Sequence, residues 1–318
     1  MITPNFTDVL KARREIDKYV QRTPLMRYPS LDAALGLRLL IKHENYQPTG
    51  AFKVRGGINL VSQLSPTEQQ RGVIAASTGN HGQSIAYAAQ LFDIRCTIVV
   101  PEKANAMKVD SMKHYNAEVV FHGTDFDEAR VYCEQLARAQ NFRYVHSGNE
   151  PLLIAGIGTL TLEMLEDAPE ISVIIVPVGG GSGAAAACLV AKTIKPDVRV
   201  IGVQSEAAPA AYKSWRAKEL LEDRMETEAE GLATRVAFEL PQRMLWKMLD
   251  EFVLVSEDDI REALVMYVEK AHTLAEGAGA ASLAAAAKFR ERLSGQTCAL
   301  VLSGGNITGD QLRRTLGA

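Results

Sequence analysis

Four short stretches of this sequence combine the residue types that do chemistry with glycines that let other groups approach the backbone closely. They are residues 49–53, 77–82, 178–183 and 303–306, which read TGAFK, STGNHG, VGGGSG and SGGN. Together they supply one amine, several hydroxyls and a run of glycines. This combination indicates a site that binds a small molecule carrying a phosphate and uses a lysine on it.

The lysine is Lys53, which follows the aromatic residue Phe52 and precedes an apolar helical pattern that begins at Val54. A lysine amine can form an imine with an aldehyde if its surroundings lower its pKa. The alternative is an ordinary solvated lysine on the protein surface. Lys53 alone does not distinguish the two, so its interpretation depends on the other stretches.

The glycine-rich stretch follows the apolar run 173–178 and opens an expected helix. Unpaired N–H groups and the helix dipole at such a place can hold a phosphate, although a tight strand-to-helix turn has the same appearance. The stretch has neither the spacing of nucleotide-hydrolysing P-loops nor that of dinucleotide-binding loops. It therefore favours a cofactor with one phosphate, held by Gly179, Gly180, Gly181, Ser182 and Gly183.

The stretch from Ser77 to His81 connects the apolar run 73–76 to a helix. Its N–H groups, with the hydroxyls of Ser77 and Thr78, could bind the carboxylate of a substrate. The alternative is an ordinary helix-capping turn at Asn80 and His81. The candidate substrate-binding residues are Ser77, Thr78, Gly79, Asn80 and His81.

The elements that must position these stretches alternate between strand and helix through most of the chain. Strands alternating with helices of this length imply parallel pairing through right-handed crossovers. Only the segment 205–245 shows no clear pattern. We expect strands at residues 37–41, 73–76, 96–100, 118–121, 173–178, 199–203, 253–255 and 297–302.

The composition fits a globular protein with more than one core, since 47% of the 318 residues are hydrophobic and 23% are charged. A net charge of −3 gives no electrostatic footprint for nucleic acid or an anionic membrane. The four cysteines form no C-x-x-C pair, and neither a signal peptide nor an apolar run of about 20 residues is present. We therefore expect a cytoplasmic protein whose partner is a small molecule.

The order and spacing of the four stretches resemble the threonine dehydratase and serine racemase branch of the pyridoxal-phosphate enzymes, across nearly the whole chain. These enzymes share the tryptophan synthase β-subunit fold. The resemblance implies an α/β fold with two lobes, each a mostly parallel sheet flanked by helices. It implies a large cofactor-binding domain of residues 1–45 plus 145–318, a small mobile domain of residues 46–144, and a homodimer or higher homo-oligomer.

The resemblance also implies a role for each candidate residue around pyridoxal 5′-phosphate. Lys53 would form the imine beside Phe52, Asn80 would contact the ring hydroxyl, and Glu276 would lie near the ring. Ser303 would hydrogen-bond the ring nitrogen and leave it largely unprotonated, which favours β-elimination over transamination. Two positions depart from the pattern. Ala51 replaces a common serine, and Thr78 replaces the serine that serves as acid or base in the racemases.

A metal ion is not expected at the position where the racemase-like members bind a divalent cation. Gln204 and Ala210 stand where those members have acidic ligands, and hard cations prefer charged oxygen ligands. Glu206 could replace a ligand or could be a surface acid. The six histidines show no ligand spacing for a transition metal.

The expected function is that of an ammonia-lyase that converts a β-hydroxy amino acid, L-threonine or L-serine, to a 2-oxo acid and ammonia. The alternatives are a serine racemase and a dehydratase for phenylserine, for hydroxyaspartate or for a hydroxyectoine-derived amino acid. The last is suggested by the resemblance of residues 231–241 to a dehydratase-like subgroup. A catalytically silent ligand-binding protein is the non-enzyme alternative, against which Lys53, Asn80 and Ser303 argue.

Overall fold

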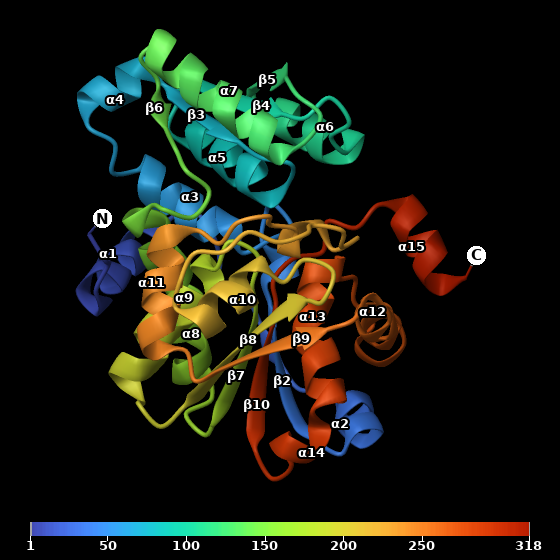
Figure 1. Ribbon diagram of the computed structural model, residues 1–318. Helices are drawn as coiled ribbons and strands as arrows, with labels where there is room; N and C mark the ends of the chain where they lie inside the picture. Colours follow the sequence, from blue (N-terminus) through green and yellow to red (C-terminus); the bar gives the residue numbers. More distant parts are fainter. Residues whose placement is uncertain (1, 318) are drawn as a thin grey trace.

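Within residues 2–317, which the computed structural model describes, two β-sheets form the framework of the protein (Figure 1). The larger sheet has the order β1 (Leu25–Met26), β2 (Arg38–His43), β10 (Thr297–Leu302), β7 (Val173–Pro177), β8 (Arg199–Ser205) and β9 (Glu251–Val255). The smaller has the order β5 (Glu118–Phe121), β4 (Cys96–Val100), β3 (Val73–Ala76) and β6 (Arg143–Tyr144). Apart from the antiparallel pair β1 and β2, neighbouring strands are parallel, which confirms the predicted architecture.

The larger sheet is covered on both faces, which explains why its central strands are continuous apolar runs. In β7, Ile174 and Val176 point into one core, whereas Val173 and Ile175 point into the other. The helices over the first core are α8 (Pro151–Asp167), α9 (Ser182–Ile194), α10 (Ala210–Ala217) and α11 (Glu239–Met248). Those over the second are α2 (Pro29–Leu35), α12 (Glu257–Ala271), α13 (Gly277–Lys288) and α14 (Arg290–Leu293), with α15 (Gly309–Leu316) packed on α12.

The smaller sheet has its own pair of cores. Ile98 and Val100 of β4 face one of them, and Val99 faces the other. The helices of this part are α3 (Lys53–Val61), α4 (Pro66–Arg71), α5 (Asn80–Leu91), α6 (Ala106–His114) and α7 (Phe126–Ala139), and α1 (Phe6–Ile16) packs against α3. Helix α8 contributes to the cores of both sheets, because Leu153 packs with the smaller one and Ile154 with the larger one.

Helices α3 and α8 approach closely where glycines meet. A Cβ on Gly56 would lie 2.9 Å from the carbonyl oxygen of Leu153, and one on Gly156 would lie 2.6 Å from that of Arg55. Both distances are too short for a side chain. The predicted close packing at Gly156 therefore serves the junction between the helix that begins at Lys53 and the helix shared by both cores.

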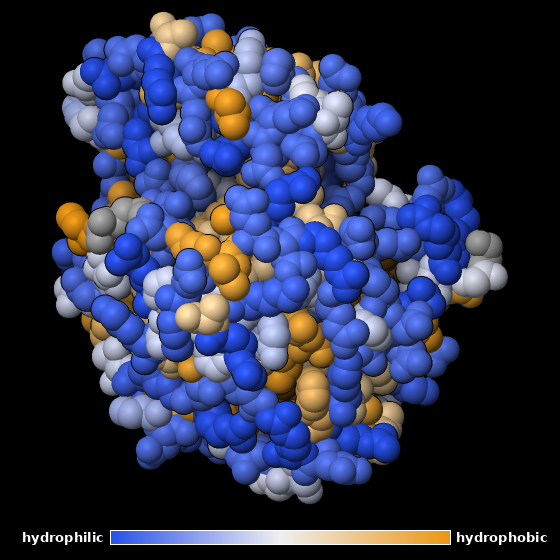
Figure 2. Space-filling view, viewed as in Figure 1, coloured by the Kyte–Doolittle hydropathy of each residue, from blue (hydrophilic) through white to orange (hydrophobic). Residues whose placement is uncertain are grey.

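The outer surface agrees with the composition. Figure 2 shows a predominantly hydrophilic face with scattered apolar residues. Among residues 2–317, none of the helices combines the length and the hydrophobicity that crossing a bilayer requires.

A buried ionic cluster ties α3 to α8 and to the larger sheet. The guanidinium of Arg55 lies 2.8 Å from the carboxylate of Glu44 and 2.6 Å from that of Glu163. The amine of Lys42 lies 2.5 Å from the same Glu163 carboxylate. All four side chains are buried, so each charge depends on its partners to offset its desolvation. Burial alone would lower the pKa of Arg55, but the two carboxylates hold it above its ordinary value.

Replacing Glu163 by Gln should destabilise the protein by about 3–5 kcal/mol, because it leaves Arg55 and Lys42 with one buried carboxylate between them. Urea unfolding of the apoprotein would measure the change. The matched control is Glu166→Gln on the same helix, whose ion pairs with Arg13 and Arg22 are exposed. The control should cost no more than about 1 kcal/mol. Equal losses in the two variants would contradict this account of the cluster.

Candidate active site

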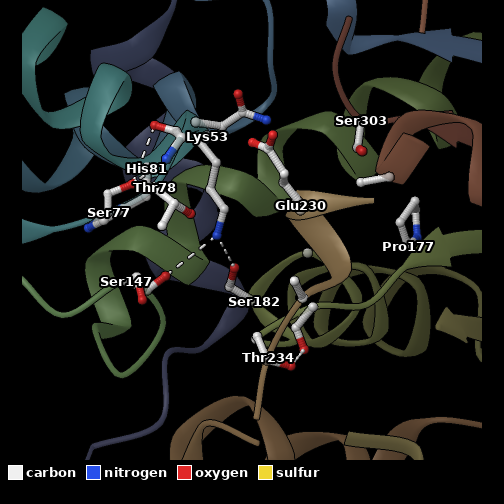
Figure 3. Close-up of a pocket in the computed structure, with 18 of the residues that line it drawn as sticks. Lys53, Ser77, Thr78, His81, Ser147, Pro177, Ser182, Glu230, Thr234 and Ser303 are labelled. Carbon is white, nitrogen blue, oxygen red and sulfur yellow. Dashed lines mark hydrogen bonds between the residues drawn. The ribbon is translucent and has the colours of Figure 1, made fainter. Parts of the chain in front are cut away.

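A pocket between the two sheets brings the four chemical stretches together (Figure 3). It opens at the carboxyl ends of β3, β7 and β10, where side chains from neighbouring parallel strands converge. Every site residue predicted from the sequence lines it, namely Phe52, Lys53, Ser77, Thr78, Gly79, Asn80, His81, Gly179, Gly180, Gly181, Ser182, Gly183, Glu276 and Ser303. Their individual roles remain predictions.

Lys53 is the first residue of α3, and its side chain extends into the pocket (Figure 3). Its amine donates to the hydroxyl of Ser182 at 3.0 Å and to the carbonyl oxygen of Ser147 at 3.5 Å. Among residues 2–317, no carboxylate forms an ion pair with it. Burial therefore lowers the pKa of Lys53 to about 8. An amine with this pKa is a usable nucleophile and base near neutral pH.

The glycine loop leaves β7 at Pro177 and enters α9 at Ser182. Gly181 takes φ +91°, a conformation that side chains rarely adopt. The N–H groups of Gly180 to Gly183 donate to no other residue in the described part of the chain. They stand at the positive end of a helix of 13 residues. The cradle and the lysine beside it fit the phosphate and the aldehyde of the expected cofactor.

Two of these glycines have a further purpose that the sequence did not reveal. A Cβ on Gly179 would overlap the carbonyl oxygen of Gly231, and one on Gly180 would overlap the ring of Phe238. The segment 229–238 therefore lies directly on the glycine loop. The prediction that all these glycines serve the anion was too narrow.

The stretch after β3 combines both interpretations that its sequence allowed. The hydroxyl of Ser77 accepts hydrogen bonds from the N–H groups of Gly79 at 3.1 Å and Gly82 at 2.8 Å, so Ser77 is used in capping α5. The N–H groups of Thr78, Asn80 and His81 donate to no other described residue. These three N–H groups and the Thr78 hydroxyl remain available for a carboxylate.

Asn80 and Glu276 are paired at the opposite wall. The amide nitrogen of Asn80 donates to the Glu276 carboxylate at 2.5 Å, and its oxygen accepts from Asn306 at 2.8 Å. Burial raises the pKa of Glu276, which favours its neutral form. Glu276 also precedes α13 as its N-cap residue, so the alternative of a helix-start acid is right about its place but not about exposure.

His81 and Ser303 complete the predicted set. The Nε2 atom of His81 lies 3.5 Å from the carbonyl oxygen of Val145, and its buried Nδ1 has no partner among residues 2–317. Burial lowers the pKa of His81 to about 3, so the ring is neutral. Ser303 follows β10, and its carbonyl oxygen accepts from the N–H of Phe52 at 3.0 Å. This bond ties the end of β10 to the residue before Lys53.

The sequence reasoning missed three side chains that line the pocket, namely Lys108, Glu230 and Phe238. The amine of Lys108 lies 2.6 Å from the Glu230 carboxylate and 3.5 Å from that of Glu276. Burial opposes the charge on Lys108, but the two acids outweigh burial and raise its pKa. Residues 231–241 had drawn notice as a subgroup feature, which was the one signal near Glu230 and Phe238. Lys108 had no local signal.

The residues at the position of the racemase cation have partners within the protein. The side-chain oxygen of Gln204 accepts from the N–H of Tyr212 at 3.0 Å, and Ala210 begins α10. Glu206 forms an ion pair with Lys288 at 2.8 Å. In the described part of the chain, no group of three acidic, histidine or cysteine side chains is arranged to hold a metal ion.

Comparison with known proteins supports the predicted family. The family model described as pyridoxal-phosphate dependent enzyme matches residues 16–304. The chain is 38% identical to the L-threonine ammonia-lyase of Thermotoga maritima, over 97% of this chain and 77% of that protein. The structure resembles maize serine racemase, with a TM-score of 0.94 and 30% identity over 99% of this chain and 98% of that one. It also resembles a threonine deaminase from the organism abbreviated T.th., with a TM-score of 0.91 and 35% identity over 96% and 99%. With its lysine, its phosphate cradle and these relatives, the chain belongs to the pyridoxal-phosphate dependent enzymes.

Proposed function

We propose that this protein is an ammonia-lyase that converts L-threonine or L-serine to a 2-oxo acid and ammonia. The observation that carries the proposal is the amine of Lys53, which has a lowered pKa and lies between two sets of free N–H groups. The similarity to the L-threonine ammonia-lyase and the threonine deaminase supports the same activity. In the net reaction, the α-proton and the β-hydroxyl leave as water, and a water molecule then replaces the amino group.

The residues around Lys53 would hold pyridoxal phosphate in one orientation. The N–H groups of Gly180 to Gly183 would bind its phosphate, Lys53 its aldehyde carbon, Asn80 its ring hydroxyl and Ser303 its ring nitrogen. When bound, the cofactor supplies an electron-withdrawing ring that stabilises negative charge at the substrate Cα. A hydroxyl partner such as Ser303 does not force a proton onto the ring nitrogen.

The chain itself would orient the substrate and move the proton. The N–H groups of Thr78, Asn80 and His81 would hold the α-carboxylate. The neutral amine of Lys53 would take the α-proton at Nζ, and the Ser182 hydroxyl, 3.0 Å from that atom, would keep it aligned. The similarity to maize serine racemase makes inversion of serine the second candidate activity. Thr78 lines the pocket on the side where a second proton carrier would act.

We also propose that residues 46–144 move as a small domain and that the protein is a cytoplasmic homodimer. The smaller sheet has its own cores and one wall of the pocket, so its motion would open and close the site. All four cysteines are free and buried, which suits a reducing compartment. Sedimentation analysis would measure the oligomer, and small-angle scattering with and without substrate would measure closure.

Replacing Lys53 by Ala should reduce release of 2-oxo acid from L-threonine and L-serine by at least about 10³-fold, because it removes both the anchor and the base. Borohydride should fix the cofactor to the wild type but not to this variant. Lys113→Ala on the exposed face of α6 is the matched control. Full activity in Lys53→Ala would contradict the lyase proposal. Ligand binding by a wild type that never turns over would favour the silent binding protein.

The rate at which the apoprotein takes up pyridoxal phosphate should depend on the protonation of Lys53. Because burial lowers the pKa of Lys53 to about 8, only the amine above that pH is largely neutral and able to attack. Uptake at pH 7 should therefore be about tenfold slower than at pH 9 or above, followed by the change in absorbance. N-acetyl-lysine amide, with an ordinary amine, should keep accelerating to pH 10. A midpoint above pH 10 for the protein would refute the lowered pKa.

A further inference from the structure

Besides Lys53, Lys108 is the cation that lines the pocket in the described part of the chain, and its charge is already matched. Its amine lies 2.6 Å from the carboxylate of Glu230 and 3.5 Å from that of Glu276. Lys108 comes from α6, Glu230 from the segment 229–238 and Glu276 from the start of α13. The pocket therefore has a cation that is held between two acids from the other side.

Two further cations near the pocket mouth have the same arrangement. Arg130 follows the pocket residue Phe126 by one helical turn, and Arg235 directly follows the pocket residue Thr234. Each guanidinium lies between two carboxylates, at 2.8 Å from Glu134 and 3.6 Å from Asp127 for Arg130, and at 3.3 Å from both Asp125 and Asp127 for Arg235. Neither has a charge to spare for a ligand.

The only acid among the pocket-lining residues 2–317 that is not fully buried is Glu230, whose side chain is 34% exposed. Figure 3 shows it between Lys53 and Ser303, reaching into the space that a substrate must share. The α-carboxylate of an amino acid has the free N–H groups of Thr78, Asn80 and His81 on the other side. A second carboxylate on the substrate side chain would approach Glu230 without a free cation, and like charges in a partly desolvated site repel strongly.

We propose that Glu230 is a specificity-determining residue that restricts this enzyme to β-hydroxy amino acids with an uncharged side chain and rejects those with a second carboxylate. This inference rests on the proposed lyase function, and it rules against the hydroxyaspartate alternative. Removing the Glu230 charge makes the pocket more positive by one unit whether or not Glu276 carries a proton. Removing the Lys108 charge has the opposite effect. The two variants therefore predict changes of opposite sign.

The test compares L-asparagine with L-aspartate, which have nearly the same shape and differ by one charge. Their dissociation constants for the holoenzyme are measured from the absorbance change of the cofactor. The wild type should bind L-asparagine at least tenfold more tightly. Glu230→Gln should lower this preference about tenfold, and Lys108→Met should raise it.

The matched control is Glu226→Gln, which removes one negative charge from an exposed side chain on the same stretch of chain. Its preference should equal that of the wild type. An unchanged ratio in Glu230→Gln, or the same change in Glu226→Gln, would overturn the proposal. Thermal melting of each variant checks that the fold is kept.

Turnover gives a second reading that separates this inference from the proposed function. The ratio of kcat/KM for L-threonine to that for 3-hydroxyaspartate should fall about tenfold in Glu230→Gln. A wild type that prefers 3-hydroxyaspartate would refute the role of Glu230 and leave the lyase proposal intact. A wild type that releases no 2-oxo acid from any of these substrates would refute the lyase proposal, and the binding ratio would still decide the role of Glu230.

Discussion

Desolvation of one amine is the constraint that the rest of the site serves. Lys53 can act only if it loses its proton near neutral pH, and burial without a neighbouring carboxylate lowers its pKa for this purpose. A carboxylate beside it would have the opposite effect. Glu276 and Glu230 accordingly face Lys108, while Lys53 has a serine hydroxyl and a carbonyl oxygen as partners. The pocket thus keeps its charges in one half and its uncharged amine in the other.

The same helix carries the opposite solution two residues later. Arg55 lies in α3 close to Lys53, yet it is fully charged and bonded to two buried carboxylates. The helix therefore begins with a cation that is kept unpaired for reaction and continues with one that is paired for anchoring. Because Arg55, Glu44 and Glu163 belong to different elements, their bonds fix the direction in which α3 enters the pocket. Placement of Lys53 is secured by charges that never touch the reacting atoms.

Most of the fold and the predicted site residues could be obtained from the sequence because their signals are local. The strands β3, β4 and β10 are apolar runs bounded by polar or glycine residues, and their predicted limits match the structure. The segment 205–245 was not assigned, since α10 and α11 are short and the chain between them is held by distant contacts such as Leu232 in the core. Lys108 was missed for the same reason, because its partner Glu230 is 122 residues away.

The contact between Phe238 and Gly180 joins two parts of the site that evolution could otherwise have varied separately. One part faces the phosphate of the cofactor, and the other carries the residues that face the variable end of a substrate. Since the ring of Phe238 leaves no room for a methyl group on Gly180, the two surfaces must change together or not at all. A chimera that imports the 229–238 segment from a relative would succeed only with a residue of matching size opposite the loop.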